Sequence, residues 1–284
     1  MKVTLPPLLL LAIWISSFSA RAEISATNEP APGIYIHSET RTNPPTRLFV
    51  ATVDLANPKL HLRVAPGGPD PDGPGKWETT LMEPTRIAAR ENFDFVINGD
   101  FFDARGVHDG EGTNSQYHAG QWARPEGPAM TDGQTWSTRT NARPCLVVHR
   151  DRSAVIETIN EPSEADWEVI AGNTILVRDG VAILHENKKQ HPRTAVGLDR
   201  AGTRLTILIV DGRKPGIAVG MSYDELAQEM VRLGCAVALN LDGGGSSVMA
   251  VRDPASGKMK IINEPTDGHE RAVADVLGIS ADNH

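Results

Sequence analysis

The sequence predicts an α/β protein of a mixed, strand-rich kind, with a single domain built on a mixed β-sheet core and a few packed helices. Three observations predict it. Short apolar, β-branched runs recur along the chain, only two segments have a helical pattern, and the composition is that of a globular protein. The 284 residues are 40% hydrophobic and 23% charged, which is enough for one large domain and excludes disorder, collagen and a disulfide-rich scaffold.

The strand signals begin after residue 46. Strands are expected over residues 48–55, 60–64, 95–98, 154–159, 174–184, 205–210, 237–241, 248–251, 260–263 and 273–279. The stretch 174–184 is expected to fold back on itself at Asp179-Gly180, a pair of residues typical of tight turns.

Two helices are expected. One spans about residues 84–91, and a stronger one opens at Ser222, whose hydroxyl can cap the helix while Glu225 reaches back from the third position. An apolar face follows at helical spacing and Gly234 ends the helix. Glu225 is therefore assigned to the helix cap rather than to catalysis.

The amino-terminal residues have the pattern of a secretory signal peptide. Lys2 precedes a mostly apolar run over 8–18, and the small-residue site Ala20-Arg21-Ala22 follows it. We expect cleavage after Ala22 and a secreted or periplasmic protein, without a membrane segment once the signal is removed; an uncleaved anchor is the alternative. Residues 23–46 are rich in Pro, Thr and Asn and predict a linker, which leaves 47–284 as the folded domain.

The two cysteines, Cys145 and Cys235, could form a disulfide or remain as free thiols. An oxidising compartment permits a disulfide between them. Each, however, begins an apolar strand-like run, where a free thiol packs as a small hydrophobic group.

Charge and histidine patterns exclude several functions. The formal net charge is -8 and no basic stripe interrupts it, so nucleic acid is not an expected partner. The nine histidines form no HExxH or comparable ligand spacing, so neither a metal site nor a cofactor is predicted.

Acidic residues follow three of the expected strands. Asn98-Gly99-Asp100 and Asn240-Leu241-Asp242 each end a strand that comes after a helix, and Asp211-Gly212 ends a third strand. Carboxylates at such strand ends tend to converge in the ligand crevice of α/β proteins, although Asp and Gly also make ordinary turns there. A shared site and separate turns are about equally favoured by this pattern alone.

The sharpest motif is the run 239–247, in which an apolar strand leads into Asp242 and three consecutive glycines. Glycines let the backbone approach a ligand closely and turn N–H groups toward an anion. The run matches neither a P-loop nor GxGxxG, and Ser246-Ser247-Val248 fails the nucleophile-elbow pattern GxSxG. The motif therefore indicates an anion-binding turn with a carboxylate rather than a catalytic serine.

Two further features bear on the ligand. Residues 104–143 form a long, weakly periodic segment that carries Tyr117, Trp122 and Trp136, which can stack on a sugar or merely anchor the loop. Outside it, Arg193, Arg213 and Arg271 lie beside strand or turn signals. Guanidinium binds phosphate through two parallel hydrogen bonds, while pairing with a surface carboxylate is the alternative.

Taken in order, these motifs resemble the phosphodiester glycosidase family over roughly residues 48 to 280. The matching segments are Asn98-Gly99 with Phe101-Phe102, Ala171-Gly172 with Asp179-Gly180, 193–197, Asp211-Gly212, 225–227, 240–246, 263–267 and Arg271. The stretch Asn-Leu-Asp-Gly-Gly-Gly-Ser is the most specific of them. This chain departs from the family at Asp100, where the family commonly has glycine, so no catalytic role is carried over to Asp100.

The resemblance implies a glycosidase that breaks the glycosidic C–O bond of a sugar 1-phosphodiester, such as a GlcNAc-1-phosphodiester, whether a small molecule or a glycan. It would release free sugar and a phosphomonoester. Asp242 is the candidate nucleophile or general base, and Asp211 is the second catalytic candidate. The residues expected to hold substrate or phosphate are Asn98, Gly99, Arg193, Thr194, Asn240, Gly243, Gly244, Gly245, Ser246 and Arg271. Two alternatives stay open: an envelope protein that binds glycan without turnover, and a glycosidase for non-phosphorylated glycans.

Overall fold

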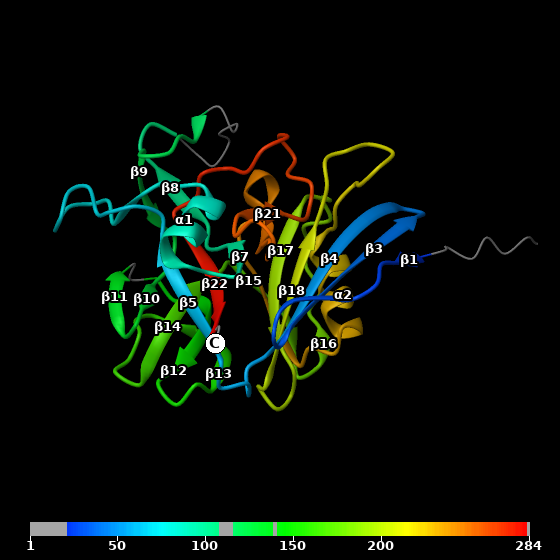
Figure 1. Cartoon of the computed structure of the whole chain (residues 1–284), viewed down its shortest axis with the longest axis horizontal. Coiled ribbons are helices and arrows are strands. Elements are labelled where there is room, and N and C mark those ends of the chain that lie inside the picture. The colour runs from blue at the N-terminus through cyan, green and yellow to red at the C-terminus, as the bar shows by residue number, and fades with distance from the viewer. Residues whose placement is uncertain (1–21, 108–115, 139–140, 283–284) are drawn as a thin grey trace, which may run out of the picture.

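The computed structural model describes residues 22–107, 116–138 and 141–282. Within them the chain forms four β-sheets and two α-helices, so the fold is strand-rich as expected but mostly β, with few helices (Figure 1). The expectation of a mixed sheet is wrong, because every strand pair among these residues is antiparallel. Parallel pairs need a crossover connection, usually a helix, after each strand, and this chain has too few helices to supply them.

The largest sheet has nine strands in the order β1-β3-β4-β18-β17-β19-β15-β16, with β2 paired to β3. Its strands are β1 (Ala22–Ile24), β2 (Asn28–Ala31), β3 (Ile34–Thr42), β4 (Pro45–Asp54), β15 (Thr174–Arg178), β16 (Val181–Ala182), β17 (Arg193–Leu198), β18 (Arg204–Val210) and β19 (Val237–Asn240). The expected fold-back at Asp179-Gly180 is the turn between β15 and β16.

Two five-stranded sheets lie opposite the nine-stranded one. The first runs β11 (Gln134–Ser137), β10 (Ala129–Thr131), β14 (Asp166–Ala171), β12 (Arg143–His149) and β13 (Ala154–Ile159). The second runs β21 (Met259–Ile261), β20 (Met249–Arg252), β7 (Phe95–Asn98), β22 (Asp275–Ala281) and β5 (Leu60–Pro66), and a small third sheet joins β6 (Thr79–Thr80), β9 (Trp122–Pro125) and β8 (Phe102–Ala104). The weakly periodic segment 104–143 thus contains short strands, which are too brief to show a periodicity.

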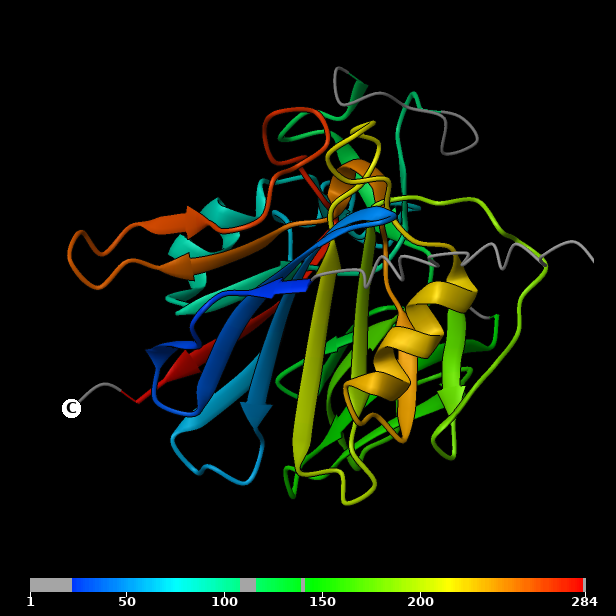
Figure 2. The ribbon, with the colours of Figure 1, turned by 90° about the vertical axis from the view of Figure 1, so that its right-hand side faces the viewer.

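The central strands β17 and β18 of the large sheet are buried on both faces, which explains the nearly continuous apolar sequence of β18. In β18, Leu205, Ile207 and Ile209 face the core between the sheets, while Leu208 and Val210 face α2 (Tyr223–Arg232). Figure 2 shows α2 lying along that outer face. On the other side, α1 (Pro84–Glu91) covers the sheet that contains β7 and β22. The order is therefore helix, sheet, core, sheets, helix.

Both helices begin as their sequences predict. At α2 the Ser222 hydroxyl accepts a hydrogen bond from the Glu225 N–H, and the Glu225 carboxylate accepts one from the Ser222 N–H at 2.7 Å. This capping box satisfies two donors that the first turn would leave unpaired. Glu225 is thus confirmed as a helix cap.

The predicted linker 23–46 is wrong, because its described residues belong to the fold. β3 pairs with β4 along nine residues, and Ile34 is fully buried. Arg41 binds the buried Glu229 of α2 at 2.9 Å, which joins this segment to the helix. Its Pro and Thr content indicated a linker, but those residues also suit strands at the edge of a sheet. The proposed signal peptide lies, apart from Ala22, outside the described residues.

The two cysteines are free and buried. Cys145 lies in β12 and Cys235 just before β19, and burial raises the pKa of both thiols, that of Cys235 to about 11. Both therefore pack as small apolar groups.

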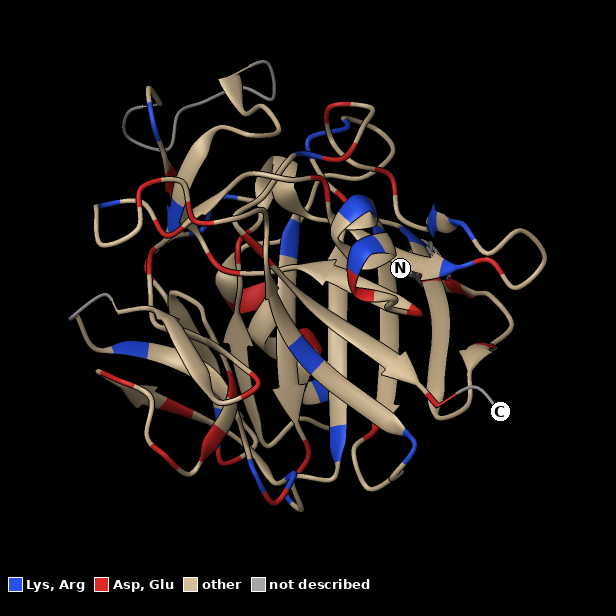
Figure 3. Ribbon diagram, turned by 60° about the vertical axis from the view of Figure 1, so that its left-hand side comes forward, with Lys and Arg blue, Asp and Glu red and all other residues tan. Residues whose placement is uncertain are grey.

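Charged residues are concentrated in loops and near strand ends, with both signs interspersed (Figure 3). Across the described ranges, neither helix is long and apolar enough to cross a bilayer.

Gly278 gives a test of the packing in the second five-stranded sheet. It lies in β22 against Phe93, and a Cβ there would be 2.0 Å from a ring carbon. We expect Gly278→Ala to lower the free energy of unfolding by about 1–3 kcal/mol, measured by urea denaturation, because the ring and sheet must shift. In a double-mutant cycle with Phe93→Ala, the combined loss should be smaller than the sum of the two. An additive result would contradict the crowding argument.

Candidate active site

The Gly-rich motif lies at the end of the large sheet where several strand ends meet. β18 and β19 both pair antiparallel with β17, so their carboxyl ends flank the amino end of β17. The end of β7 joins them, since the Asp242 N–H donates to the Gly99 carbonyl at 3.0 Å. Figure 1 shows the one-turn helix η2 (Gly244–Ser246), in orange, above β17 at this end.

A cavity of about 540 Å³ opens over this motif. Besides the motif itself, its walls come from the residues after β7, the segment around β9, the residues just before β17 and just after β18, which lie at the same end of that pair, and the carboxyl-terminal loop. The lining residues are Phe101, Phe102, Tyr117, Glu126, His191, Arg193, Arg213, Asp242, Gly243, Gly244, Gly245, Asp267 and Arg271. Aromatic, cationic and acidic groups are thus brought together, as a ligand site requires.

Asp242 is the acid beside the glycines, and it lines the cavity. Its Oδ1 accepts a hydrogen bond from the Gly243 N–H at 2.8 Å. Burial raises the pKa of Asp242 to about 6, while hydrogen bonding from Ser246 and the charge of Arg271 act in the opposite direction. A carboxylate of this kind is ionised at neutral pH yet basic enough to accept a proton.

The glycines are required for close backbone packing. Gly244 has φ +62°, and a Cβ at Gly243 would lie 2.7 Å from the Pro192 carbonyl oxygen. The loop amides were expected to bind phosphate, but two of them are already hydrogen-bonded within the protein. The Gly243 N–H donates to Asp242, and the Gly244 N–H donates to Pro192 O at 2.9 Å. The turn therefore orients Asp242 as well as lining the cavity.

Two arginines and a histidine supply positive or donor groups. The Arg271 guanidinium lies 4.5 Å from the centre of the Tyr117 ring, 3.5 Å from Ser246 Oγ and 3.8 Å from Asp267. Arg213 is exposed and approaches His191 Nδ1 at 3.5 Å. Burial, then the charges of the nearby basic residues, lower the pKa of His191, so it is a neutral donor or acceptor at neutral pH. Arg213 and Arg271 therefore present the cationic side of the cavity.

Arg193 is in the cavity wall, but its guanidinium is committed elsewhere. Nε donates to Met221 O at 2.9 Å and one Nη donates to Lys189 O at 3.1 Å. The group also lies 4.1 Å from the centre of the Tyr223 ring, and only 5% of the residue is exposed. Arg193 therefore holds the entry to β17 in place, with two of its donors already bonded to carbonyls.

Three of the residues expected to contact substrate instead support the Gly-rich motif from below through hydrogen bonds. Asn98 donates to the Asp242 carbonyl at 2.7 Å and accepts from Thr194 Oγ1 at 2.8 Å. Asn240 donates to Asn173 and to Leu241 O. Asn98, Thr194 and Asn240 are fully buried and none lines the cavity, so they position the turn rather than touch a sugar.

Asp211, the second catalytic candidate, does not line the cavity. Its carboxylate accepts hydrogen bonds from Asn263 Nδ2 at 3.1 Å and from the Glu264 N–H at 3.2 Å, and burial raises its pKa. Asp211 therefore ties the end of β18 to the turn after β21. The strand-end pattern could not distinguish it from Asp242, because the direction of a side chain depends on its tertiary neighbours.

The three aromatic residues of the segment 104–143 have different roles: one lines the cavity and two do not. Tyr117 lies in the cavity, edge-on to Phe102 at 5.4 Å between ring centres. Trp122 has the Arg105 guanidinium 4.5 Å from its ring, and Trp136 donates to Thr131 Oγ1 at 2.9 Å. The tryptophans anchor their strands, whereas Tyr117 faces the ligand space.

Asp100, the position that departs from the family pattern, supports the opposite wall. Its carboxylate accepts hydrogen bonds from the Phe101 N–H at 2.7 Å and from the Gly127 N–H at 2.8 Å. Its own N–H donates to the buried Asp275. Burial raises the pKa of both acids. A Cβ at position 99 would be 2.1 Å from Asp275 Oδ1, so only glycine has room there.

Glu126 and Asp267 are cavity acids that the sequence patterns missed. Glu126 binds Arg143 at 2.7 Å and is partly exposed. Neither residue ends a regular strand beside a glycine run; Asp267 lies in the family-matching segment 263–267 but was given no role there, and no local signal marked Glu126. Among the described residues, no group of three or more His, Cys, Asp or Glu side chains is placed to share a metal ion.

Comparison with known proteins gives consistent results. A family model for phosphodiester glycosidase matches residues 91–280, more than half of the chain. The catalytic domain of zebrafish N-acetylglucosamine-1-phosphodiester α-N-acetylglucosaminidase, auto-inhibited by its pro-peptide, aligns with a TM-score of 0.64 and 20% identity over 91% of this chain and 88% of that chain. A solved protein of Burkholderia pseudomallei K96243 aligns with a TM-score of 0.66 and 13% identity over 93% and 97%. These two likenesses show the shared fold.

A relative found by sequence matches a shorter part of the chain than the solved structures do. The prophage-derived uncharacterized protein YomE of Bacillus subtilis (strain 168) is 44% identical over 91 residues, which are 32% of this chain and 13% of that protein. The chain thus matches only a small part of that relative's length.

Fold and site together define a class: an antiparallel β protein with a carboxylate, arginines and a glycine turn around one cavity. The chain belongs to the phosphodiester glycosidase family, as the matched family model shows.

Proposed function

We propose that this protein is a hydrolase that breaks the glycosidic C–O bond of a sugar 1-phosphodiester, with a GlcNAc-1-phosphodiester as the model substrate. The observation that carries the proposal is that Asp242 faces the same cavity as Arg213 and Arg271. A sugar 1-phosphodiester presents an electrophilic anomeric carbon next to an anion, and this cavity offers a base beside cations. Family membership and the fold shared with the zebrafish enzyme support it.

In the proposed reaction, Asp242 either removes a proton from the water that attacks the anomeric carbon, or attacks that carbon itself and forms a glycosyl ester, which water then hydrolyses to release the sugar and the free carboxylate. The bond between C1 and the bridging oxygen breaks, and its electron pair leaves with the phosphate, which departs as a phosphomonoester. Guanidinium groups stabilise this charge directly, so the reaction depends less on a general acid than ordinary glycoside hydrolysis does. Tyr117 and Phe102 provide apolar ring surface for the sugar.

The position of the broken bond tests this function. Hydrolysis of a GlcNAc-α-1-phosphodiester in ¹⁸O-labelled water, followed by mass spectrometry, should place the label in free GlcNAc and none in the phosphate. Label in the phosphate, or release of GlcNAc-1-phosphate, would overturn the mechanism. If no sugar phosphodiester is turned over, a glycan-binding protein is favoured, and hydrolysis of non-phosphorylated glycans alone would indicate an ordinary glycosidase.

We also propose that the protein is exported after cleavage following Ala22, on the basis of the amino-terminal pattern. Intact-mass measurement of the secreted protein should give a chain that begins at Glu23, within a few residues. A full-length product that stays in the cytoplasm would refute export.

A further inference from the structure

Two acidic residues, Asp100 and Asp275, lie against each other beneath one wall of the candidate active site. Asp100 follows β7 and Asp275 begins β22, and these two strands pair with each other. The backbone N–H of Asp100 donates to Asp275 Oδ1 at 2.7 Å. Asp100 is 3% exposed and Asp275 0%, so both carboxyl groups are shielded from water.

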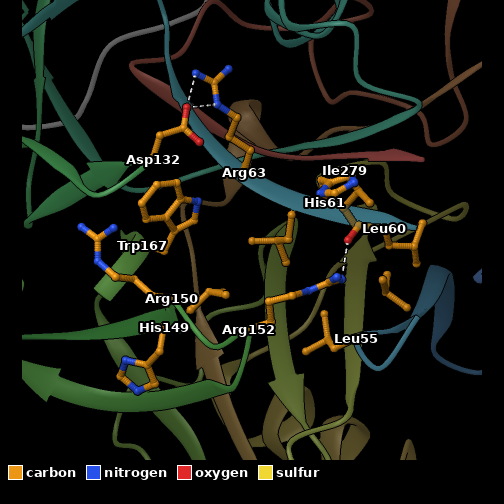
Figure 4. A pocket seen from close by; sticks show the side chains of 13 residues that line it. Leu55, Leu60, His61, Arg63, Asp132, His149, Arg150, Arg152, Trp167 and Ile279 are labelled. Atoms are coloured by element: carbon orange, nitrogen blue, oxygen red, sulfur yellow. Dashed lines mark hydrogen bonds and ion pairs between the residues drawn. The ribbon is translucent and has the colours of Figure 1, made fainter. Parts of the chain in front are cut away.

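Acidic side chains elsewhere in this protein have a cation beside them. The buried Asp94 pairs with Arg252 at 3.2 Å. In a cavity that shares no lining residue with the candidate active site, Figure 4 shows the Arg63 guanidinium facing Asp132, at 2.8 Å. Within the described ranges of the chain, neither acid of the buried pair has such a cation.

Two adjacent carboxyl groups in such surroundings cannot both be ionised without a large cost, because neither water nor a cation offsets their repulsion. The pair therefore retains one proton to a higher pH than a single exposed acid does, and its two ionisations belong to the pair as a whole. Burial raises the pKa of Asp275 to about 7, and burial together with the charge of Asp275 raises the pKa of Asp100.

The surroundings of the pair do not supply the missing positive charge. The acids that act on it are Asp242, after β19, and Glu126, after β9. The buried Cys145 thiol of β12 lies in the field of Asp100. Arg143, at the start of β12, is a cation of this region, but it binds Glu126 at 2.7 Å. These groups are negative, neutral or already paired, so they oppose a second ionisation of the pair.

The hydrogen bonds assign the proton to Asp275. Both oxygens of the Asp100 carboxyl group accept from backbone N–H groups, those of Phe101 at 2.7 Å and Gly127 at 2.8 Å, and such bonds stabilise an anion. Asp275 Oδ2 has no hydrogen-bond partner in the part of the chain that the structure describes. A buried neutral O–H without a partner costs less than a buried negative oxygen without one, so the proton belongs on this oxygen.

The pair also joins two walls of the active-site cavity. On one side, the Asp242 N–H donates to the Gly99 carbonyl at 3.0 Å, and Gly99 packs directly on the Asp275 carboxyl group. On the other side, the Asp100 carboxylate binds the Phe101 N–H, and the Phe101 carbonyl accepts from the Glu126 N–H at 2.7 Å. The positions of both walls therefore depend on the pair between them.

We propose that Asp100 and Asp275 share a single proton at neutral pH, carried by Asp275, and that in this form the pair positions the Gly99 and Glu126 walls of the cavity. The family commonly has glycine at position 100, so the pair is a property of this chain rather than of the family pattern. The proposal does not depend on the proposed hydrolysis, and none of its tests requires a substrate.

NMR of protein labelled with ¹³C at the aspartate carboxyl carbons detects the proton directly and leaves the glutamates silent. Between pH 6 and 7, one aspartate signal should have the chemical shift of a protonated acid and be absent from Asp275→Asn. The Asp100 signal of that variant should be that of a carboxylate, because the neutral amide no longer repels it. Only carboxylate signals in the wild type, or a protonated signal that no change at Asp275 removes, would overturn the proposal.

The urea midpoint of unfolding gives a second measure. Asn is a neutral mimic of the protonated acid, so Asp275→Asn should keep a midpoint close to that of the wild type at pH 7. Asp94→Asn is the matched control, a buried aspartate whose replacement leaves Arg252 unpaired, and its midpoint should fall. Equal losses in the two variants would contradict a protonated Asp275.

The pH dependence of this midpoint has a defined sign. The pKa of Asp275 is about 7 in the folded chain against an ordinary value of 3.8, so this group makes wild-type stability fall as the pH rises from about 4 to about 7. The midpoint of Asp275→Asn, taken relative to wild type, should therefore rise over the same interval. A constant difference between the two proteins would count against the shared proton.

Hydrogen exchange tests the positioning. The Phe101 and Gly127 amides should exchange with deuterium at least about tenfold faster in Asp100→Ala, which removes both acceptors, and at the wild-type rate in Asp275→Asn. If Asp100→Ala does not fold, Asp100→Asn gives the same comparison, because its amide nitrogen cannot accept one of the two bonds. Equal exchange in the Asp100 and Asp275 variants would refute the positioning role.

Discussion

Replacing Asp242 by Asn should lower the turnover of a sugar 1-phosphodiester by about 10²- to 10⁴-fold, the range typical of a lost general base. The amide keeps the shape of the side chain and can still contact the Gly243 N–H through its oxygen, but it can neither attack carbon nor accept a proton. Substrate affinity, measured by titration of the inactive variant, should persist because Arg213 and Arg271 are unchanged. Retention of more than about a tenth of the turnover in a folded variant would remove Asp242 from catalysis.

Asp211→Asn is the matched control for Asp242→Asn. Both acids follow strands of the large sheet, but Asp211 binds Asn263 and Glu264 outside the cavity. Its replacement should leave the turnover of the folded protein within a few-fold of wild type. If Asp211→Asn lost as much turnover as Asp242→Asn, Asp211 would have to be considered a catalytic residue.

The pH profile gives an independent check on Asp242. Its pKa is raised to about 6, so the carboxyl becomes protonated as the pH falls through that value. A base or nucleophile must be ionised, so kcat/KM should fall tenfold per pH unit below about 6 and be level above it. The residual activity of Asp242→Asn should lack this limb.

Replacing Arg271 by Ala should lower kcat/KM for a sugar 1-phosphodiester by about 10²- to 10³-fold, comparable to the removal of one donor that stabilises transition-state charge. Arg271 lies against Tyr117 and near Ser246, so its charge is held at the cavity rather than free in solvent. Arg213→Ala should act in the same direction with a smaller effect, since Arg213 is exposed and more strongly screened.

The substrate's phosphate distinguishes this role from simple damage to the site. With an aryl N-acetylglucosaminide, whose leaving group carries no phosphate, Arg271→Ala should lose much less activity than with the phosphodiester. Arg124→Ala is the control, because Arg124 is an arginine of the same region that pairs with Asp103 and does not line the cavity. Equal losses with both substrates would show that Arg271 maintains the structure of the cavity instead of binding phosphate.

Short-range patterns predicted much of the secondary structure. The span 84–91 is α1, Ser222 and Glu225 form the capping box, and the apolar run 205–210 lies within a strand buried on both faces. Each of these follows from interactions within a few residues or from the burial of a continuous apolar sequence. The turn at 242–246 was also predicted from its run of glycines, of which Gly243 packs closely against Pro192 and Gly244 has a positive φ.

Other predictions failed where long-range contacts decide. The segment 23–46 looked like a linker until β3 paired with β4, and Asp211 looked like Asp242 until Asn263 and Glu264 turned its carboxylate away from the cavity. Arg193 likewise donates to the carbonyl of Met221, 28 residues further along the chain, as well as to that of the nearby Lys189.

By itself, the sequence determined the two helices and many of the strands, where a carboxylate meets a glycine turn, and which family the motifs resemble. Only the tertiary structure decided that the sheets are antiparallel, that Asp242, Arg213 and Arg271 share a cavity, and that Asn98, Thr194 and Asn240 lie beneath it. The physical reason is the sequence distance over which the interactions act. Propensity, capping and turn formation involve only a few neighbouring residues, whereas the direction and the partner of a side chain depend on groups that folding brings from distant parts of the chain.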